Sequence, residues 1–454
     1  MIRTALMFVF LVALNSFADV HAATTEEAKL LQLAEVATET AVRVRGLEPL
    51  RPLTTRVTTR EAVESYVVDR LETTGMSAEL AATATMLVHF GALPPGTDLS
   101  AVLRRVLREQ VAGYYDWIEE TLFIADWLPT FLQLPTLIHE VTHALQDQHH
   151  DLGRFMEPNP GFSEASVAVA ALIEGDATLV LMGEVLASHD PEESPLSRLA
   201  KRSKITMITR LMRHEIETEP SLQNVPAVLR NMLVFPYVEG LNLAAIVHSE
   251  GGWPAIDALY DNPPLSTEQV LHVDKLLQVP RDHPVELHLP APPSDDVEVL
   301  GSDTLGELGI REMLATQLPR DRSSRAAAGW GGDRYLLMGR RNPTPTPAQR
   351  WATTRWPGPN GAGLARGLEP TTLCWIAEMD SPEDNEELAA ALGSLISPPQ
   401  HLSREGTRLV AGWGASSVLP AEKCHALLLE TRSERVTHYD WYAKRATATP
   451  PPAP

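Results

Sequence analysis

The feature that most constrains the fold is the apolar segment GFSEASVAVAALIEGDATLVLMGEVLAS, residues 161–188. It is apolar on most sides of a helix, which predicts a helix buried inside the protein. Glu174 lies in its middle, and no lysine or arginine occurs between Phe155 and Arg198. Because an unpaired buried carboxylate costs several kcal/mol, a cation must lie close to Glu174. The fold must therefore bring another part of the chain, or a metal ion, to this helix.

A second predicted helix carries groups that bind such a cation. In LPTLIHEVTHALQDQ, residues 134–148, His139 and His143 are four residues apart and so lie on one helix face. A catalytic zinc site takes three protein ligands and leaves its fourth position for water. With Glu174 as the third ligand, the two helices predict a His-His-Glu zinc site. Glu140, rotated by ~100° from His139, would miss the ion but could reach its water as a general base.

The histidine pattern alone is a moderate signal, because it also arises by chance in a chain with 15 histidines. The alternative is a surface helix whose histidines pair with Glu140 and Asp147. The setting of Glu174 favours the metal site, since Ala170, Ala171 and Ala177 around it leave room for a second helix to approach.

The stretch HEVTHALQDQHHDL followed by ALIEGDAT resembles the gluzincin branch of the HExxH zinc metallopeptidases, and within it a group of exported bacterial proteins. The resemblance continues in EQVAGYYDWIEETLFIAD and FPYVEGLNLAAIVHSEGGWPAIDALYDNPPLSTEQVLH and covers roughly residues 40 to 280. LGELGIREMLA and AAAGWGGDRYLLM are similar to the C-terminal region of the group, less specifically. By position, the resemblance implies His139, His143 and Glu174 as zinc ligands and Glu140 as the base.

The chain departs from that group at two turns. Trp117 follows Asp116, and Val273 follows His272, at positions where the group has proline. Both departures concern turn geometry and leave the ligand set intact. The interval between the histidine pair and the glutamate ligand is longer than in thermolysin-like enzymes, so the connection between the two helices differs from theirs.

The fold class expected is α+β: a mostly helical zincin-like metallopeptidase domain with a small sheet, and a smaller C-terminal α+β domain. Proline and aspartate enrichment marks a linker, and the Pro/Ala-rich end has nothing to bury. The predicted segments are a signal peptide at 1–22, the metallopeptidase domain at 23–285, the linker at 286–300, the C-terminal domain at 301–445 and a disordered tail at 446–454.

The N-terminus predicts export to the periplasm or the extracellular space. Arg3 precedes an apolar run at residues 5–14, and Val20-His21-Ala22 provides a cleavage site for a signal peptidase. No other run is expected to reach the ~18 apolar residues of a membrane-spanning helix, so no span is predicted after signal removal. The formal net charge of -21 argues against nucleic acid as a partner, because phosphates would be repelled.

Two cysteines lie in the C-terminal region. Cys374 occurs in the predicted strand TTLCWIAEM, and Cys424 in CHALLLE, which also reads as a strand. In an exported protein they could form one disulfide, and two buried free thiols are the alternative. In the same region, Ser381 is predicted to cap the N-terminus of the helix in SPEDNEELAAALGSLI.

The predicted activity is zinc-dependent hydrolysis of peptide bonds in a peptide or protein substrate. Zinc (Zn2+) would polarise the scissile carbonyl and lower the pKa of its water towards ~7. Glu140 would accept the proton and pass it to the leaving amine. The strand TLFIA, Thr121 to Ala125, is predicted to be an exposed edge that pairs with the substrate backbone, with an ordinary sheet member as the alternative.

Three residues are candidates to donate a hydrogen bond to the oxyanion: His272, Tyr237 and Tyr114. The spacing of PPLSTEQVLH predicts a capping box that places His272 in a short helix. Each of the three could instead be structural. Asp147, one turn after His143, is a candidate to orient the second ring nitrogen of that histidine.

Two other functions remain open at this point. The chain could be an exported zinc-binding protein that acts as a partner-binding module without proteolysis. It could also be a zinc hydrolase of non-peptide amides or esters. Glu140 favours a hydrolase, because a purely structural zinc site has no use for a base and closes its fourth position.

Overall fold

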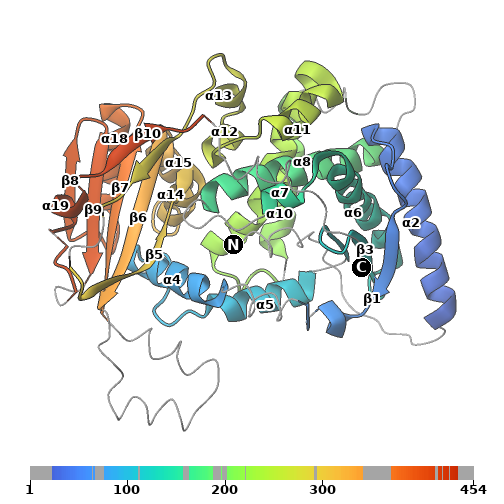
Figure 1. Ribbon diagram of the computed structural model, residues 1–454, viewed down its shortest axis with the longest axis horizontal. Helices are drawn as coiled ribbons and strands as arrows, with labels where there is room; N and C mark the ends of the chain where they lie inside the picture. Colours follow the sequence, from blue (N-terminus) through green and yellow to red (C-terminus); the bar gives the residue numbers. More distant parts are fainter. Residues whose placement is uncertain are drawn as a thin grey trace, which may run out of the picture.

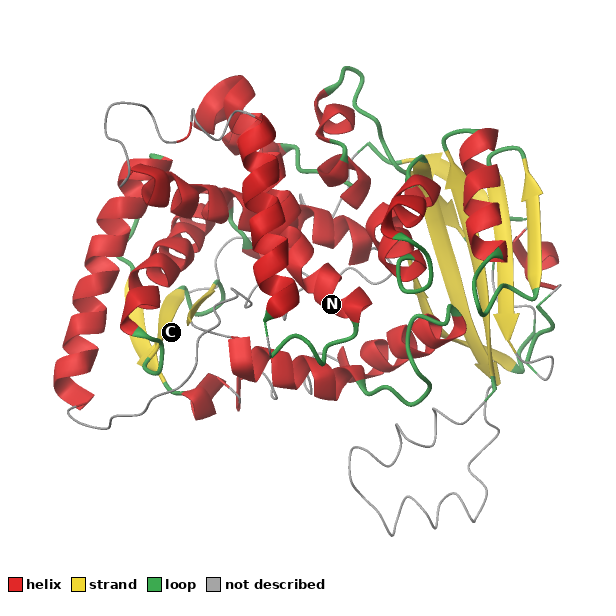
Figure 2. Ribbon diagram, turned by 180° about the vertical axis from the view of Figure 1, so that it is seen from behind, coloured by secondary structure: helices red, strands yellow, loops and turns green. Residues whose placement is uncertain are grey.

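The structure, a computed structural model, describes residues 23–437 except 64, 67–75, 111–112, 157–162, 188–195, 197–201, 220, 291–293, 341–369, 415–417, 422 and 429. The chain folds as α+β, as predicted. A helical part lies at one side of the molecule and a five-stranded sheet with its own helices at the other (Figure 1; Figure 2). The predicted signal peptide and the predicted tail lie outside the described residues, and the domain boundaries remain predictions.

The first part is built mostly of helices, several of them long. Their bounds are α2 Ala23–Arg45, α4 Met76–His89, α5 Leu99–Gln110, α6 Thr130–His150, α7 Gly153–Met156, α8 Ser163–Ala187, α10 Arg202–Thr218, α11 Ala227–Asp261, α12 Thr267–Leu271 and α13 Val273–Leu277. His139, Glu140 and His143 lie in α6. This helix begins directly after Pro129 and ends at His150, and the next residue, Asp151, has the left-handed conformation. Ser266 caps α12 by accepting a hydrogen bond from the Gln269 N–H, as its spacing predicts.

A three-stranded sheet lies beside α6. Its order is β1-β3-β2, with β1 Thr54–Thr58, β3 Thr121–Ala125 and β2 Gly113–Asp116; β1 runs parallel to β3, and β2 runs antiparallel to it. The expectation of an edge strand at Thr121 to Ala125 is therefore wrong, because β3 is the central strand. A parallel partner, β1, arrives from far upstream in the sequence, and the local pattern of β3 carries no trace of it. Of the two edge strands, β2 is the one that bonds to Glu140 on α6.

The second part contains a five-stranded antiparallel sheet of order β5-β6-β7-β9-β8. Its strands are β5 Val297–Asp303, β6 Trp330–Arg340, β7 Thr371–Met379, β9 Arg408–Gly414 and β8 His401–Glu405. Its helices are α14 Gly306–Leu314, α15 Arg320–Ala327, α18 Pro382–Gly393 and α19 Lys423–Leu428. Ser381 caps α18 by accepting from the Asp384 N–H, which confirms that prediction.

Two expectations about the second part differ from the structure. The stretch CHALLLE was expected to be a strand, but its first residues belong to helix α19. Cys424 on this helix forms a disulfide with Cys374 on β7, so the two cysteines pair. The predicted linker also contains regular structure: β4 Val285–His288 pairs antiparallel with β10 Arg432–Arg435, and β5 begins at Val297. Both strands form through partners that are distant in sequence.

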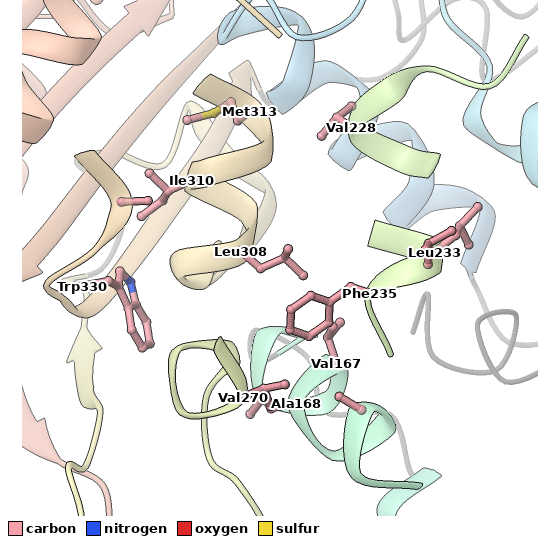
Figure 3. Packing of buried hydrophobic residues seen from close by; sticks show 14 of the residues in the cluster. Val167, Ala168, Val228, Leu233, Phe235, Val270, Leu308, Ile310, Met313 and Trp330 are labelled. Carbon is pink, nitrogen blue, oxygen red and sulfur yellow. The ribbon is translucent and has the colours of Figure 1, made fainter. Parts of the chain in front are cut away.

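One continuous apolar cluster joins the two parts. In Figure 3, Leu308 of α14 and Phe235 of α11 meet above Val167 of α8. Elsewhere in the cluster, Phe90 packs edge-on against Trp375 and Trp413 of the sheet, with ring centroids 5.8 and 4.5 Å apart. The helical part and the five-stranded sheet therefore share their core.

Two of these helices are long and apolar enough to cross a membrane, contrary to the expectation that no run after the signal peptide would be. They are residues 163–185 of α8 and residues 227–261 of α11. In the most apolar window of the first, 94% of residues are buried inside the protein, and 67% in the second. Such burial is typical of the core helices of a globular protein.

Candidate metal centre

Helices α6 and α8 bring three predicted ligands together at one point. Oε2 of Glu174 lies 3.0 Å from Nε2 of His139 and 3.3 Å from Nε2 of His143, and the two nitrogens are 3.1 Å apart. His139 and His143 are each 1% exposed, and Glu174 is 0% exposed. The helical spacing in α6 and the buried carboxylate in α8 therefore converge as the sequence indicates.

A close crossing of α8 and α11 places Glu174 at this point. Gly175 of α8 faces Gly240 of α11 so closely that a Cβ at Gly175 would collide with the backbone of Gly240. A Cβ at Gly240 would in turn collide with the carbonyl of Ala171, one turn before Gly175. Small residues thus let the two helix backbones touch beside the carboxylate. The alanines of α8 were expected to make room for the histidine helix, and at Ala171 the close neighbour is Gly240 of α11.

The proton distribution in the cluster follows from burial and charge. Burial acts to lower the pKa of His143, but the adjacent Glu174 outweighs it and raises that pKa to about 9. For Glu174, burial acts to raise the pKa, and the two histidines bring it below its ordinary value. For His139, burial lowers the pKa. A divalent cation at the same place would displace the proton held between His143 and Glu174, since metal ligands must be deprotonated.

Glu140 lies next to the cluster and contacts the small sheet. Its Oε2 accepts a hydrogen bond of 3.1 Å from the backbone N–H of Tyr115 on β2. Gly113 on the same strand also lies beside this side chain, because a Cβ there would be in ordinary contact with Cγ of Glu140, at 3.8 Å. Burial raises the pKa of Glu140 to about 8, partly offset by His143. The carboxylate is thus a buried group that can exchange a proton near neutral pH, as a general base requires.

Gln146, which the sequence reading missed, holds His143 in place. Nδ1 of His143 lies 2.8 Å from Oε1 of Gln146, whose Nε2 donates to the carbonyl of Ile173, directly before Glu174. Asp147 was expected in this role, and that expectation is wrong. Asp147 accepts instead from the hydroxyl of Tyr115 at 2.8 Å and from the Leu152 N–H at 3.0 Å.

A buried ionic network fixes α8 from its other side. Arg45, at the end of α2, donates to Oδ1 of Asp176 at 2.8 Å and to Asp257 of α11 at 2.6 Å. The hydroxyl of Tyr260 also donates to Asp176, and the guanidinium lies over the ring of Trp253. Asp176 is two residues from Glu174, so this network ties α2 and α11 to the helix turn that carries the third ligand.

The candidate oxyanion donors lie in different surroundings. The ring of Tyr237 on α11 lies 6.0 Å from the ring of His139, measured between centroids, so it stands beside the cluster. Tyr114 stacks on Tyr66 and Phe123 instead. His272 lies between α12 and α13, and its Nε2 is 3.0 Å from Oε1 of Glu307 on α14.

A second group of acidic residues has ligand-like spacing but already holds a cation. Glu268, Asp282 and Asp380 converge on Nζ of Lys275, at 2.7, 3.2 and 2.7 Å respectively. In the His-His-Glu cluster, by contrast, no lysine or arginine among the described residues pairs with Glu174. Oε1 of Glu174 is also buried and finds no hydrogen-bond partner within the described part of the chain. Two imidazoles and a carboxylate with a free oxygen fit a zinc ion.

Comparison with known proteins touches only the second part of the chain. Residues 297–441 match a family model described as a domain of unknown function (DUF8575). No curated protein and no solved structure matches the chain. The matched range covers the five-stranded sheet and excludes His139, His143 and Glu174.

Proposed function

We propose that the chain is a zinc-dependent metallopeptidase with a zincin-like helical part. The observation that carries this proposal is the convergence of His139, His143 and Glu174 within 3.0–3.3 Å, with no lysine or arginine among the described residues to neutralise the carboxylate. A fully buried carboxylate beside two imidazoles is stable when a cation completes the group. Two histidines and a glutamate are the ligand set of one class of catalytic zinc site.

The residues around the ligands can then share the work of peptide hydrolysis. When bound, zinc supplies a Lewis acid that polarises the scissile carbonyl. Glu140 would accept a proton from the attacking water and return it to the leaving amine. Its hydrogen bond from the Tyr115 N–H holds the carboxylate in one orientation beside the ligands. Tyr237 is the candidate donor to the oxyanion, because its ring stands next to His139.

The substrate proposed is an extended peptide or protein segment. Strand β2 is the edge of the small sheet nearest the motif, and its Tyr115 N–H points away from β3 towards Glu140. The pairing with substrate backbone first expected for β3 is proposed for β2, through backbone groups other than the Tyr115 N–H, which already bonds to Glu140. Glu140 is 4% exposed, so a peptide reaches it only after the covering elements move. The export signal in residues 1–22 supports action outside the cytoplasm.

The same burial favours a second candidate function. A structural zinc site is closed, and all four residues of the centre are buried. The chain would then be an exported zinc-binding module whose five-stranded sheet binds a partner. A zinc hydrolase acting on non-peptide amides or esters would use the same residues as the peptidase.

One experiment separates these functions. The purified mature protein and its Glu140→Gln variant are analysed for zinc content and incubated with a mixed peptide library and with a panel of esters and amides. A peptidase retains zinc in both proteins and cleaves peptides only as the wild type. Zinc in both without any cleavage identifies the binding module, and cleavage confined to the panel identifies the other hydrolase. Peptide cleavage that persists in Glu140→Gln contradicts the role assigned to the base.

A further inference from the structure

A second pair of histidines, His401 and His425, lies at one face of the five-stranded sheet, far in sequence from the first. His401 is on β8, the outer strand, and pairs across the ladder with Gly412 on β9, which pairs in turn with Cys374 on β7. Residues directly opposite each other in a sheet project from the same face. His401 and Cys374 therefore lie on one face, and Ser403, two residues along β8, joins them.

Helix α19 lies on that same face. Cys424 on α19 is bonded to Cys374, with Cα atoms 5.3 Å apart. Gly412 allows the close approach, because a Cβ there would lie 2.7 Å from the carbonyl of Ala421 and 3.1 Å from Sγ of Cys424. His425 directly follows the bonded cysteine. The disulfide and the missing side chain at Gly412 together bring His425 over β8.

The contacts of the pair match those of metal ligands. The rings of His401 and His425 have centroids 5.8 Å apart, and Nδ1 of His425 lies 2.8 Å from Oγ of Ser403. When Nδ1–H of His425 donates this hydrogen bond to Oγ of Ser403, Nε2 of His425 keeps its lone pair, which is how a metal-binding histidine is held. Nε2 of His401 is buried and has no hydrogen-bond partner within the described residues. A metal ion that accepts the lone pair of this nitrogen would give the buried atom a partner.

The separation of the rings fits a shared ion. Two imidazoles that bind one tetrahedral ion at ~2.0–2.1 Å have ring centroids about 5 Å apart. In the His139–His143 pair of the first cluster the centroids are 4.7 Å apart, against 5.8 Å for His401 and His425. We propose that His401 and His425 form a second site, for a divalent transition-metal ion such as Zn2+ or Cu2+, with Ser403 orienting His425. Imidazole nitrogens favour these ions over Mg2+ or Ca2+.

The same contacts argue against a serine nucleophile. In a hydrolytic triad a carboxylate holds the histidine that deprotonates the serine. In the described part of the chain, the groups found at His425 are the Ser403 hydroxyl and the His401 ring, and neither is a carboxylate. Two neighbouring nitrogen donors fit a metal ion better than they fit acyl transfer.

The test uses the full chain carrying His139→Ala, which removes a ligand of the first cluster and keeps this result independent of the proposed peptidase function. The chelator-treated protein is titrated calorimetrically with Zn2+ and separately with Cu2+. One equivalent should bind, and His401→Ala or His425→Ala should abolish it. Ser403→Ala should weaken binding ~10-fold by releasing Nδ1 of His425. His288→Ala, an exposed histidine on β4, is the matched control and should bind like its parent.

The electron paramagnetic resonance spectrum of the Cu2+ complex gives a second measurement that needs no further substitution. Coupling to two imidazole nitrogens is the expected result. The proposal is overturned if His139→Ala binds neither ion, if His401→Ala binds as tightly as its parent, or if the copper spectrum shows no imidazole nitrogen. Circular dichroism of each variant establishes that it is folded, and Ser403→Ala provides the comparison should a histidine variant not fold.

Discussion

Gln146 is the residue on which the orientation of His143 depends. It accepts from Nδ1 of His143 and donates to the carbonyl of Ile173, so it links the ligand on α6 to the turn before Glu174. A histidine that has lost such a partner can rotate and binds metal less tightly. Substitution of Gln146 should therefore change the affinity for the metal ion, although the Gln146 side chain is not itself a ligand.

We predict that Gln146→Ala lowers zinc affinity ~10- to 100-fold, the usual range for such supporting partners. Competition with a chromophoric chelator measures it. Gln148→Ala is the matched control on the same helix, because the Gln148 side chain bonds, among the described residues, to the backbone of Leu50 and Arg51 and not to a ligand. Equal affinities of the two variants would show that Gln146 does not support the ligand.

The sequence predicted His139, Glu140, His143 and Glu174 because helical spacing and a carboxylate in an apolar helix are local features. It indicated Asp147 as the candidate partner of His143, because Asp147 lies one helical turn later. Gln146 lies at a similar spacing on the helix and was missed. In the structure, the hydroxyl of Tyr115 on β2 donates a hydrogen bond to Asp147. This contact joins residues far apart in the sequence, so the local sequence does not predict it.

At the scale of elements, the crossing of α8 and α11 fixes the third ligand. A methyl group introduced at Gly175 would collide with the backbone of Gly240, and backbone cannot rotate away as a side chain could. Overpacking of this kind costs typically 1–3 kcal/mol, and more where only backbone could yield.

Gly175→Ala should therefore lower the free energy of unfolding by about 3 kcal/mol and weaken zinc binding, as Glu174 moves with its helix. Chemical denaturation measures the first effect. Gly393→Ala in α18 is the control, because nothing lies within 4 Å of a Cβ at that position. A Gly175→Ala protein as stable as Gly393→Ala would rule out the close crossing.

Helix α2 offers a matched pair of arginines. Arg45 is buried with Asp176, whereas Arg43 pairs with Glu184 at the surface, where its side chain is 58% exposed. Removing one partner of a buried pair leaves an uncompensated charge, so Arg45→Met should cost about 3–5 kcal/mol. Arg43→Met should cost less than about 1 kcal/mol. Urea unfolding of both variants tests the contrast; similar costs would mean that the buried network does not anchor α2.

Element type was predictable for α6, where the two histidines have helical spacing, and for α8, whose apolar run is too long for a strand. It was not predictable for α19, because the apolar run CHALLLE suits a strand and a short helix equally well. The disulfide to β7 and the packing on Gly412 are both long-range contacts. The position of β3 in the middle of its sheet likewise depends on β1, which lies far upstream.

At the scale of the whole molecule, Glu164 links the helical part to the region leading into the sheet. It lies in the first turn of α8, accepts a short hydrogen bond from the Thr267 N–H at α12, and packs against Gly306 at the start of α14. Burial raises its pKa to about 8, while the Thr267 hydrogen bond opposes this change. The folded protein therefore holds a proton on Glu164 that the unfolded chain releases near pH 4.5.

This difference sets the sign of a pH effect. Between about pH 4.5 and 8 the folded state binds more protons at this residue than the unfolded state, so the Glu164 contribution to stability falls as pH rises. Glu164→Gln keeps an acceptor for Thr267 and cannot ionise. The stability of the variant relative to wild type should therefore increase from pH 5 to pH 8.5, as measured by urea unfolding. A constant difference between the two proteins would mean that Glu164 titrates normally.

The α+β class followed from the change in pattern along the chain, and the helical content before the sheet was predictable. The shared core was not. Phe90, Trp375 and Trp413 are far apart in the sequence, and only the folded chain brings their rings together. For the same reason the predicted linker contains β4 and the start of β5, whose ladder partners are strands β10 and β6.

The central claim is that one divalent ion is held by residues of α6 and α8, and the zinc stoichiometry after gel filtration tests it most directly. Wild type, Glu140→Gln and Glu174→Gln, each in a His401→Ala background that removes the second proposed site, are loaded with zinc, freed of weakly bound metal and measured by mass spectrometry. Wild type and Glu140→Gln should each retain one tightly bound zinc, and Glu174→Gln should lose it. Zinc retained by Glu174→Gln, or absent from the wild type, would contradict the account.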